Sequence, residues 1–349
     1  MTVDSTVTTS KGNERRALAL QVSDLVVRYG NRRDGVRAVD GVSIEVARGS
    51  TLGIIGESGS GKSTLAKAIA GLVPVRSGTI AIAGPDGDLV PAASSVGRAG
   101  QVQMIFQDPV LALNPGRPVW KSVVEPMVPH RLVIPRRLRE RAVELLGQVG
   151  LGPEIADRRP GQMSGGQRQR VTIARAVAAR APLVMCDEPV AALDISVQAG
   201  VLRLLDELRG TFDLTYVFIS HDMSSIARIA HDVGVMYLGR LVEVGPVREV
   251  LETPRHPYTQ ALIRAVPRVS LDARDREVHP LEGEIPDARR PPSGCRFRTR
   301  CAFAQEICAR EEPRSETVTE PAAGGGSAHR AACHFWREIR DGTAPRRSL

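Results

Sequence analysis

The chain has 349 residues, of which 42% are hydrophobic, so it can form one large or two modest domains with a buried core, and intrinsic disorder is excluded as its default state. No apolar run approaches the roughly 18 residues that a bilayer span requires, and residues 1–16 lack the apolar core of a signal peptide. The formal charge of +8 suits a nucleotide, a nucleic acid, an anionic membrane surface or a solvated arginine-rich exterior. Because only 3% of residues are aromatic, no basic stretch carries the stacking side chains of single-strand binders. We expect a cytoplasmic protein without a nucleic-acid partner.

After an expected disordered start at residues 1–16, residues 18–29 and 42–46 are rich in β-branched side chains and predict a small antiparallel unit. Tyr29 ends the first of these strands. Its ring either stacks on a nucleobase or packs internally.

A glycine-rich stretch from Gly56 to Thr64 lies between an apolar strand at residues 51–55 and an amphipathic helix. Closely spaced glycines let consecutive N–H groups point at one anion, and the positive end of the helix dipole lies at the same place. This order predicts a phosphate-binding loop rather than an ordinary glycine turn. Lys62 can reach the β- and γ-phosphates, and the Ser63 hydroxyl can ligate Mg²⁺. The loop residues expected around the nucleotide are Gly56, Ser58, Gly59, Ser60, Gly61, Lys62, Ser63 and Thr64.

Residues 84–100 are rich in Gly, Pro and Asp and predict turns and loop, and a strand at 102–106 then ends at Gln107. From residue 118 to 161 the pattern becomes helical, which we interpret as an inserted helical subdomain.

The remaining pattern alternates helices and strands, which predicts an α/β fold with a mostly parallel sheet covered by helices. Ser164 is a plausible N-cap for a helix that opens with Gly165, Gly166 and Gln167. Ligands bind at the carboxyl ends of parallel strands. The side chains expected at such ends are Gln107, Asp187, Glu188 and His221.

One of the five cysteines, Cys186, lies alone in an apolar run, and the others follow the spacing C-x5-C-x6-C-x24-C near the C-terminus. In a reducing compartment such a group is more often metal-binding than disulfide-bonded. The spacing matches neither the paired zinc patterns nor the common ferredoxin patterns. Four thiolates can hold a cubane iron–sulfur cluster or tetrahedral zinc, and free thiols or a disulfide remain alternatives. The four residues are Cys295, Cys301, Cys308 and Cys333.

Taken together, these motifs resemble those of the ATP-binding subunits of ABC transporters. The phosphate loop corresponds to Walker A, Gln107 to the Q-loop, residues 164–168 to the signature, residues 183–188 to Walker B, residues 192–194 to the D-loop and His221 to the switch histidine. One departure is Ala191, where a serine is common. By this resemblance, the missing hydroxyl puts one dimer-interface hydrogen bond in doubt and affects no catalytic group.

A finer resemblance is to the oligopeptide/dipeptide importers. It is carried by residues 105–109, by residues 113–115, by residues 216–222 with the short helix after them, and by His256-Pro257-Tyr258 with the four residues after it. It implies an ABC ATPase domain at 17–252, with its helical subdomain at about 118–161, and a C-terminal extension at 253–340 that includes the cysteines. Some relatives of this type carry an iron–sulfur cluster there, and some import nickel or other small solutes.

The resemblance also implies a role for each motif residue. Ser63, Gln107 and Asp187 would hold Mg²⁺, Glu188 would act as general base, and Gln107 and His221 would contact metal, water or γ-phosphate. Ser164 to Gln167 would close over ATP bound to a second ATPase subunit, identical or paralogous.

Two transmembrane permease subunits and an extracytoplasmic solute-binding protein complete the implied assembly, with this chain peripheral at the cytoplasmic face of the membrane. The rival classes are a soluble ABC ATPase of DNA repair or translation and a nucleotide-gated module without turnover. A single phosphate loop and the absence of sustained heptads in the sequence argue against the first, and Glu188 with His221 argues against the second.

Overall fold

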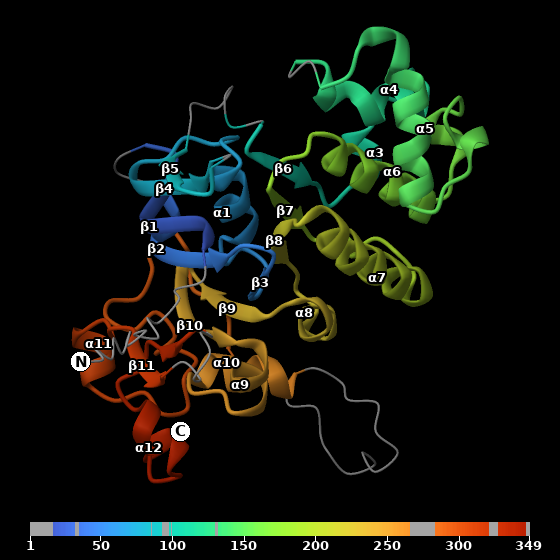
Figure 1. Ribbon diagram of the computed structural model, residues 1–349. Helices are drawn as coiled ribbons and strands as arrows, with labels where there is room; N and C mark the ends of the chain where they lie inside the picture. The colour runs from blue at the N-terminus through green and yellow to red at the C-terminus, as the bar shows by residue number, and fades with distance from the viewer. Residues whose placement is uncertain are drawn as a thin grey trace, which may run out of the picture.

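The computed structural model describes residues 17–31, 35–84, 86–92, 98, 100–129, 132–265, 283–320 and 327–346. The start of the chain expected to be disordered, residues 1–16, lies outside these ranges. Within them, one large sheet and one smaller antiparallel sheet carry the fold (Figure 1).

The large sheet combines a parallel centre with an antiparallel edge. Neighbouring strands from β9 to β6 run parallel, and β10, β12 and β11 add antiparallel pairs. This confirms the predicted mostly parallel α/β sheet. In spatial order its strands are β11 (Glu316–Thr319), β12 (His329–Ala331), β10 (Arg240–Pro246), β9 (Asp232–Tyr237), β3 (Thr51–Ile55), β8 (Thr215–Ile219), β7 (Leu183–Asp187) and β6 (Val102–Ile105).

The smaller sheet is antiparallel, as expected from the first two predicted strands. Its β5 falls inside residues 84–100, so the prediction of turns and loop was wrong there, where the strand pairs with β4. Its strands in order are β2 (Val36–Ala47), β1 (Leu18–Tyr29), β4 (Ser77–Ala83) and β5 (Leu89–Pro91).

Helices cover both faces of the large sheet. Alternate residues of β7 reach opposite faces: Leu183 and Met185 pack toward α1 (Lys62–Ile69) and the smaller sheet, whereas Val184 and Cys186 pack toward the other helices. The helices of that second face are α6 (Gly165–Ala178), α7 (Ile195–Phe212), α8 (Met223–Ile229) and α9 (Val247–Glu252).

A helical subdomain projects from the β6 edge and packs against α6. Its helices are α3 (Pro109–Ala112), α4 (Val119–Val124) and α5 (Leu138–Gln148). None of the helices in the described ranges combines the length and apolar character that crossing a bilayer demands.

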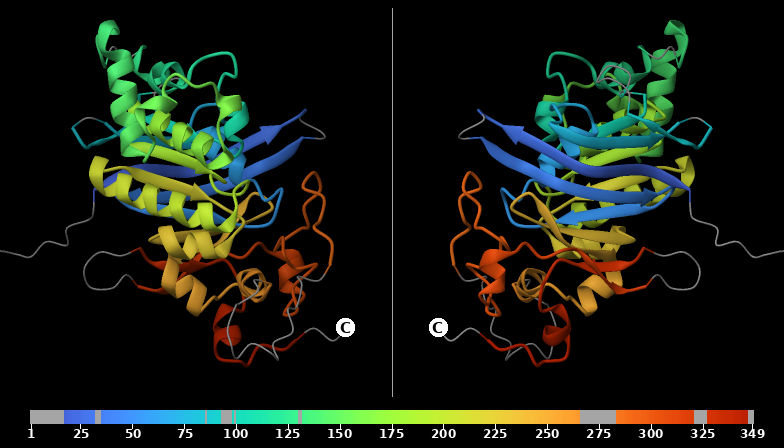
Figure 2. Two further views of the ribbon diagram at one scale, coloured as in Figure 1. Left: turned by 90° about the vertical axis from the view of Figure 1, so that its right-hand side faces the viewer. Right: turned by 90° about the vertical axis from the view of Figure 1, so that its left-hand side faces the viewer.

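The C-terminal extension lies at the opposite end of the molecule from the helical subdomain (Figure 2). Its β12 pairs with β10 through Glu243↔Ala331, so the extension continues the large sheet. Its helices are α10 (Pro257–Arg264), α11 (Ile307–Arg310) and α12 (Trp336–Arg340).

Candidate functional site

The phosphate loop, Gly56 to Thr64, connects β3 to α1, as the sequence predicts. Gly59 and Gly61 have φ of 77° and 105°, a backbone region that favours glycine. A Cβ on Gly61 would lie 2.0 Å from the carbonyl oxygen of Ala38, so no other residue fits there. The sequence therefore forms a turn whose N–H groups and helix end can face an anion.

Lys62 is buried inside this loop. Its Nζ donates to the carbonyl oxygens of Gly56 and Glu57, both at 2.8 Å. Burial lowers the pKa of the ammonium group, while the carboxylates of Glu188, Asp187 and Glu57 act to raise it. An anion bound in the loop would add to these opposing charges and favour the charged lysine.

Two of the three residues expected to hold Mg²⁺, Ser63 and Asp187, lie together, whereas the third, Gln107, bonds Glu188. Ser63 Oγ donates to Asp187 Oδ1 at 2.8 Å, which joins the start of α1 to the end of β7. The pKa of Asp187 is raised, mainly by burial, although Ser63, Lys67 and Lys62 act to lower it. A hydroxyl and a carboxylate at one point form an oxygen-donor pair that suits Mg²⁺.

The three predicted catalytic residues form one cluster. Glu188 Oε2 accepts a hydrogen bond from Gln107 Nε2 at 3.0 Å and lies 3.2 Å from His221 Nδ1. These side chains follow β6, β7 and β8, whose parallel arrangement brings their carboxyl ends to one edge of the sheet. A carboxylate held between an amide and an imidazole can orient and deprotonate water.

The Ser164 loop, residues 164–168, has an internal structure that the sequence partly predicts. Ser164 Oγ accepts the N–H of Gln167 at 3.3 Å, and Gln167 Oε1 accepts the N–H of Ser164 at 3.0 Å, which is a capping box. A Cβ on Gly166 would lie 2.8 Å from Val197 Cγ1, so this glycine permits packing on α7. On Gly165 the added atom would meet only Leu193 Cδ2, at 3.7 Å. The helix that Ser164 begins, α6, packs on the face of the large sheet opposite to α1, the helix that follows the phosphate loop (Figure 1).

Tyr29 lies at the end of β1 and is 43% exposed. It pairs with Val36, two residues before Ala38, whose carbonyl oxygen abuts Gly61. The β1–β2 pairing therefore places Tyr29 near the segment of β2 that contacts the phosphate loop. Contact of its ring with a nucleobase stays a prediction.

Two residues of the extension reach the phosphate loop, which sequence reasoning missed. Arg300 forms two hydrogen bonds with the Glu57 carboxylate, and the Tyr258 hydroxyl accepts the Glu57 N–H at 2.8 Å. The sequence pattern marks Tyr258 only as part of the extension motif. No local pattern signals a contact made across so long a stretch of chain.

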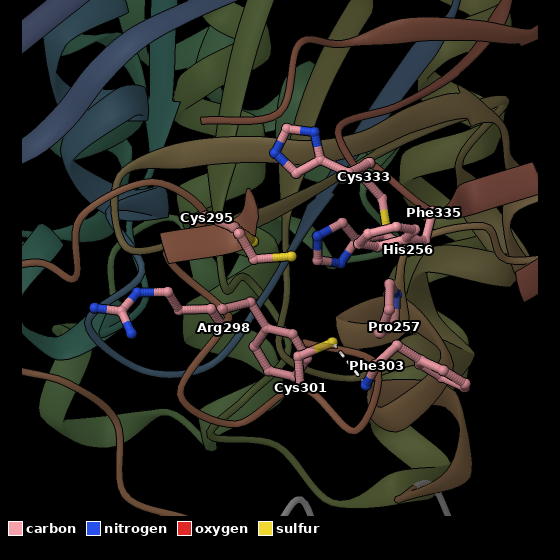
Figure 3. A pocket seen from close by; sticks show the side chains of 11 residues that line it. His256, Pro257, Cys295, Arg298, Cys301, Phe303, Cys333 and Phe335 are labelled. Atoms are coloured by element: carbon pink, nitrogen blue, oxygen red, sulfur yellow. Dashed lines mark hydrogen bonds between the residues drawn. The ribbon is translucent and has the colours of Figure 1, made fainter. Parts of the chain in front are cut away.

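All four C-terminal cysteines line one pocket (Figure 3). The sulfurs of Cys295, Cys301 and Cys333 point into it from different sides, and Phe297 and Phe335 add apolar walls. Burial raises the pKa of Cys295 to about 11 and those of Cys301 and Cys333 to about 12.

The sulfurs also receive backbone hydrogen bonds. Phe303 N–H donates to Cys301 Sγ at 3.4 Å, and backbone donors at Phe297 and Phe335 act to lower the pKa of Cys295 and Cys333. Within the described ranges, no three His, Cys, Asp or Glu side chains close on a position fit for a metal ion.

Comparisons with known proteins agree with this geometry. The ABC transporter family profile matches residues 39–191, and the profile of the oligopeptide/dipeptide transporter C-terminal region matches residues 242–308. The oligopeptide transport ATP-binding protein AppF of Bacillus subtilis is 42% identical over 303 residues, covering 86% of this chain and 90% of that protein. The oligopeptide transport ATP-binding protein OppF of Salmonella typhimurium is 40% identical over 332 residues, covering 92% of this chain and 97% of that protein.

Among solved structures, the ATP-binding cassette MJ0796, a dimer bound to ADP and Pi, has a TM-score of 0.58 and 26% identity, covering 66% of this chain and 99% of that one. The fold and site thus define an ABC-type ATPase, which binds ATP and Mg²⁺ and hydrolyses the nucleotide. Within that class, the chain belongs to the family of ATP-binding subunits of oligopeptide/dipeptide ABC transporters.

Proposed function

We propose that this chain hydrolyses ATP to power import of oligopeptides or dipeptides, with Glu188 as the general base. The observation that carries the catalytic assignment is the position of Glu188 Oε2 between Gln107 and His221, one residue after the Asp187 that bonds Ser63. The peptide cargo is supported by relatives described as oligopeptide and di/tripeptide transport ATP-binding proteins.

In hydrolysis, water attacks the γ-phosphorus and Glu188 accepts a proton from that water. The bond between the γ-phosphorus and the β–γ bridging oxygen breaks, and ADP leaves. Lys62 and the loop N–H groups bind the β- and γ-phosphates, and His221 donates to the γ-phosphate. Ser63, Asp187 and Gln107 would hold Mg²⁺, which when bound neutralises phosphate charge. Tyr29 stacks on the adenine.

The active unit in this proposal is a dimer of ATPase subunits. The helix that Ser164 begins packs on the opposite face of the sheet from α1, and Ile195, at the start of α7, is 86% exposed. Ile195 directly follows the D-loop, the segment that the proposed dimer places at the contact with the partner subunit. Residues Ser164, Gly165, Gly166 and Gln167 would then close over ATP bound by the partner subunit.

The helical subdomain is the proposed contact with the two permease subunits at the cytoplasmic face of the membrane. Leu111 on α3, four residues after Gln107, is 85% exposed, and Val110 beside it is also exposed. This position would link movement of the permease to the cluster around Glu188. A solute-binding protein on the opposite side of the membrane would deliver the peptide.

Proteoliposomes that contain this chain, its permeases and the binding protein test the proposal. With ATP on the ATPase side, labelled peptides should accumulate with the wild-type chain and fail to accumulate with Glu188→Gln. Accumulation of nickel without peptides would overturn the cargo assignment and leave the ATPase intact. Hydrolysis without any coupled transport would overturn the transport role.

For the cysteine pocket, we propose a cubane iron–sulfur cluster held by Cys295, Cys301, Cys308 and Cys333. Backbone N–H donors toward the sulfurs suit thiolates, and the apolar walls exclude water. The four cysteines that line the pocket supply the number of thiolates that a cubane cluster takes as ligands.

Anaerobic purification followed by iron, acid-labile sulfide and zinc analysis tests this assignment. We expect iron and sulfide in equal amounts, broad visible absorption, and loss of both in Cys301→Ser. A colourless anaerobic preparation without iron would overturn it.

A further inference from the structure

The C-terminal extension contacts the phosphate loop at Glu57. We propose that Arg300 and Tyr258 are positioning residues for ATP binding, which act through Glu57 on Lys62. The inference uses the established ATPase activity and is independent of the cargo and of what the cysteine pocket holds.

The first contact is a two-point ion pair. Arg300 Nη1 lies 2.7 Å from Glu57 Oε2, and Nη2 lies 3.0 Å from Oε1. The Arg300 side chain is 3% exposed and that of Glu57 is 22% exposed, so solvent screens the pair weakly. Two parallel N–H···O bonds fix the direction of the carboxylate as well as its distance.

The second contact fixes the backbone of the same residue. Tyr258, on α10, accepts the Glu57 N–H with its hydroxyl oxygen at 2.8 Å. Tyr258 is fully buried, and its ring packs against Tyr237 and Phe297 at centroid distances of 4.6 and 5.3 Å. The acceptor is therefore held by packing and not by a mobile side chain.

Glu57 in turn contacts Lys62, the residue expected to bind phosphate. Its carbonyl oxygen accepts a hydrogen bond from Lys62 Nζ at 2.8 Å. Glu57 is thus held at its carboxylate and its N–H by the extension, while its carbonyl oxygen helps to place the ammonium group. Preorganised phosphate ligands raise affinity because less ordering remains when ATP binds.

The segment that carries Arg300 has further contacts with the ATPase domain. Arg296, four residues before Arg300, donates to the carbonyl oxygen of Leu238 and pairs with Asp40 on β2. Segment 295–301 therefore contacts the ATPase domain through Arg296 before Phe297 and through Arg300 after it. The Arg296 contacts fix the backbone from which the Arg300 side chain extends.

Steady-state ATPase kinetics and binding of a non-hydrolysable ATP analogue test the proposal on Arg300→Ala, Glu57→Gln and the double variant. Each single variant should raise both KM for ATP and Kd for the analogue by roughly tenfold, with a smaller change in kcat, because Glu188, Gln107 and His221 are untouched. The double variant should bind ATP no more weakly than either single variant, because each single substitution already removes the same Arg300–Glu57 interaction. Arg337→Ala, which breaks the pair with Glu316 on β11, should leave KM and Kd unchanged.

Loss of folded protein would lower the maximal rate and leave KM unchanged, so the split between KM and kcat separates positioning from stability. Glu57→Gln leaves segment 295–301 unaltered, and Tyr258→Phe removes a single oxygen while it keeps the ring packing. Unchanged KM and Kd in Arg300→Ala and Glu57→Gln, or additive effects in the double variant, would overturn the proposal.

Discussion

Glu188 occupies a left-handed backbone conformation, with φ of 48°, which residues other than glycine rarely adopt. Its N–H donates to the Ile219 carbonyl oxygen at 3.0 Å, so the neighbouring strand holds the turn in place. A conformation of this kind costs about 1–3 kcal/mol and persists where the surroundings fix it. The turn that follows β7 places the carboxylate beside Gln107 and His221.

Glu188→Gln tests the chemistry directly. Glutamine keeps the size and polarity of the side chain but cannot accept a proton, so hydrolysis should fall by about 10²- to 10⁴-fold while ATP binding persists. Phosphate release and analogue binding measure the two effects separately. Glu207→Gln, on the exposed side of α7, is the matched control, and undiminished hydrolysis in Glu188→Gln would remove Glu188 from its role.

Asp187 illustrates a cost of function. Because its pKa in the folded protein lies above the ordinary 3.8, the native state binds more protons than the unfolded state. The free energy of unfolding therefore falls as pH rises from 3.8 through the folded pKa, and the loss is complete once the pH is well above that folded pKa.

Asp187→Asn should accordingly stabilise the nucleotide-free protein and abolish its activity. It removes the buried charge while an amide oxygen still accepts from Ser63, so at pH 7 the melting temperature should rise by about 1–4 °C. Mg²⁺-dependent hydrolysis should fall by at least about 10²-fold. Calorimetry and an ATPase assay check both, and a lower melting temperature would contradict the account.

At the scale of elements, the strands that the sequence predicted best are those with strong patterns. Residues 51–55 form a short, mostly apolar run that is followed by Gly56, and β3 has these bounds. By contrast, β4 begins Ser-Gly-Thr and carries only two isoleucines, and β12 reads His-Arg-Ala, so neither has a detectable period. Their pairing depends on distant strands.

The same contrast applies to the site. Gln107, Glu188 and His221 could be placed together from sequence because each follows a strand and parallel strands end at one edge. Arg300 could not be placed, because its partner Glu57 is 243 residues away and only the folded extension brings them together.

The start of α6 offers a matched pair of substitutions. Gly166→Ala adds a Cβ 2.8 Å from Val197 Cγ1 and should cost about 1–3 kcal/mol of stability by overpacking α6 against α7. Gly165→Ala meets its nearest atom at 3.7 Å and should leave the melting temperature unchanged. If the Ser164 loop closes on a partner subunit's ATP, Gly165→Ala should still lower hydrolysis. Full activity in Gly165→Ala would argue against that contact.

At the scale of the whole molecule, Glu243 joins the extension to the large sheet. This buried carboxylate accepts the N–H groups of Arg255 and His256 at 2.7 and 2.9 Å, and His329 Nε2 of β12 lies 2.7 Å from it. These contacts hold α10 and β12 against β10.

Glu243→Gln should loosen this joint. The amide must turn an NH₂ group toward at least one of those donors, so stability should fall by about 1–3 kcal/mol. Chemical denaturation measures the loss, and Glu306→Gln on the exposed side of the extension is the control. Equal stability of Glu243→Gln and wild type would show that the joint is dispensable.

The pairing of β12 with β10 also bears on how the chain is made. During synthesis the phosphate loop and the parallel strands leave the ribosome long before residues 300 and 329–331, so β10 remains an unpaired edge, open to pairing with another chain. Glu57 lacks its arginine partner over the same interval. The residues made later therefore both cover the outer edge of β10 and give Glu57 of the phosphate loop its arginine partner.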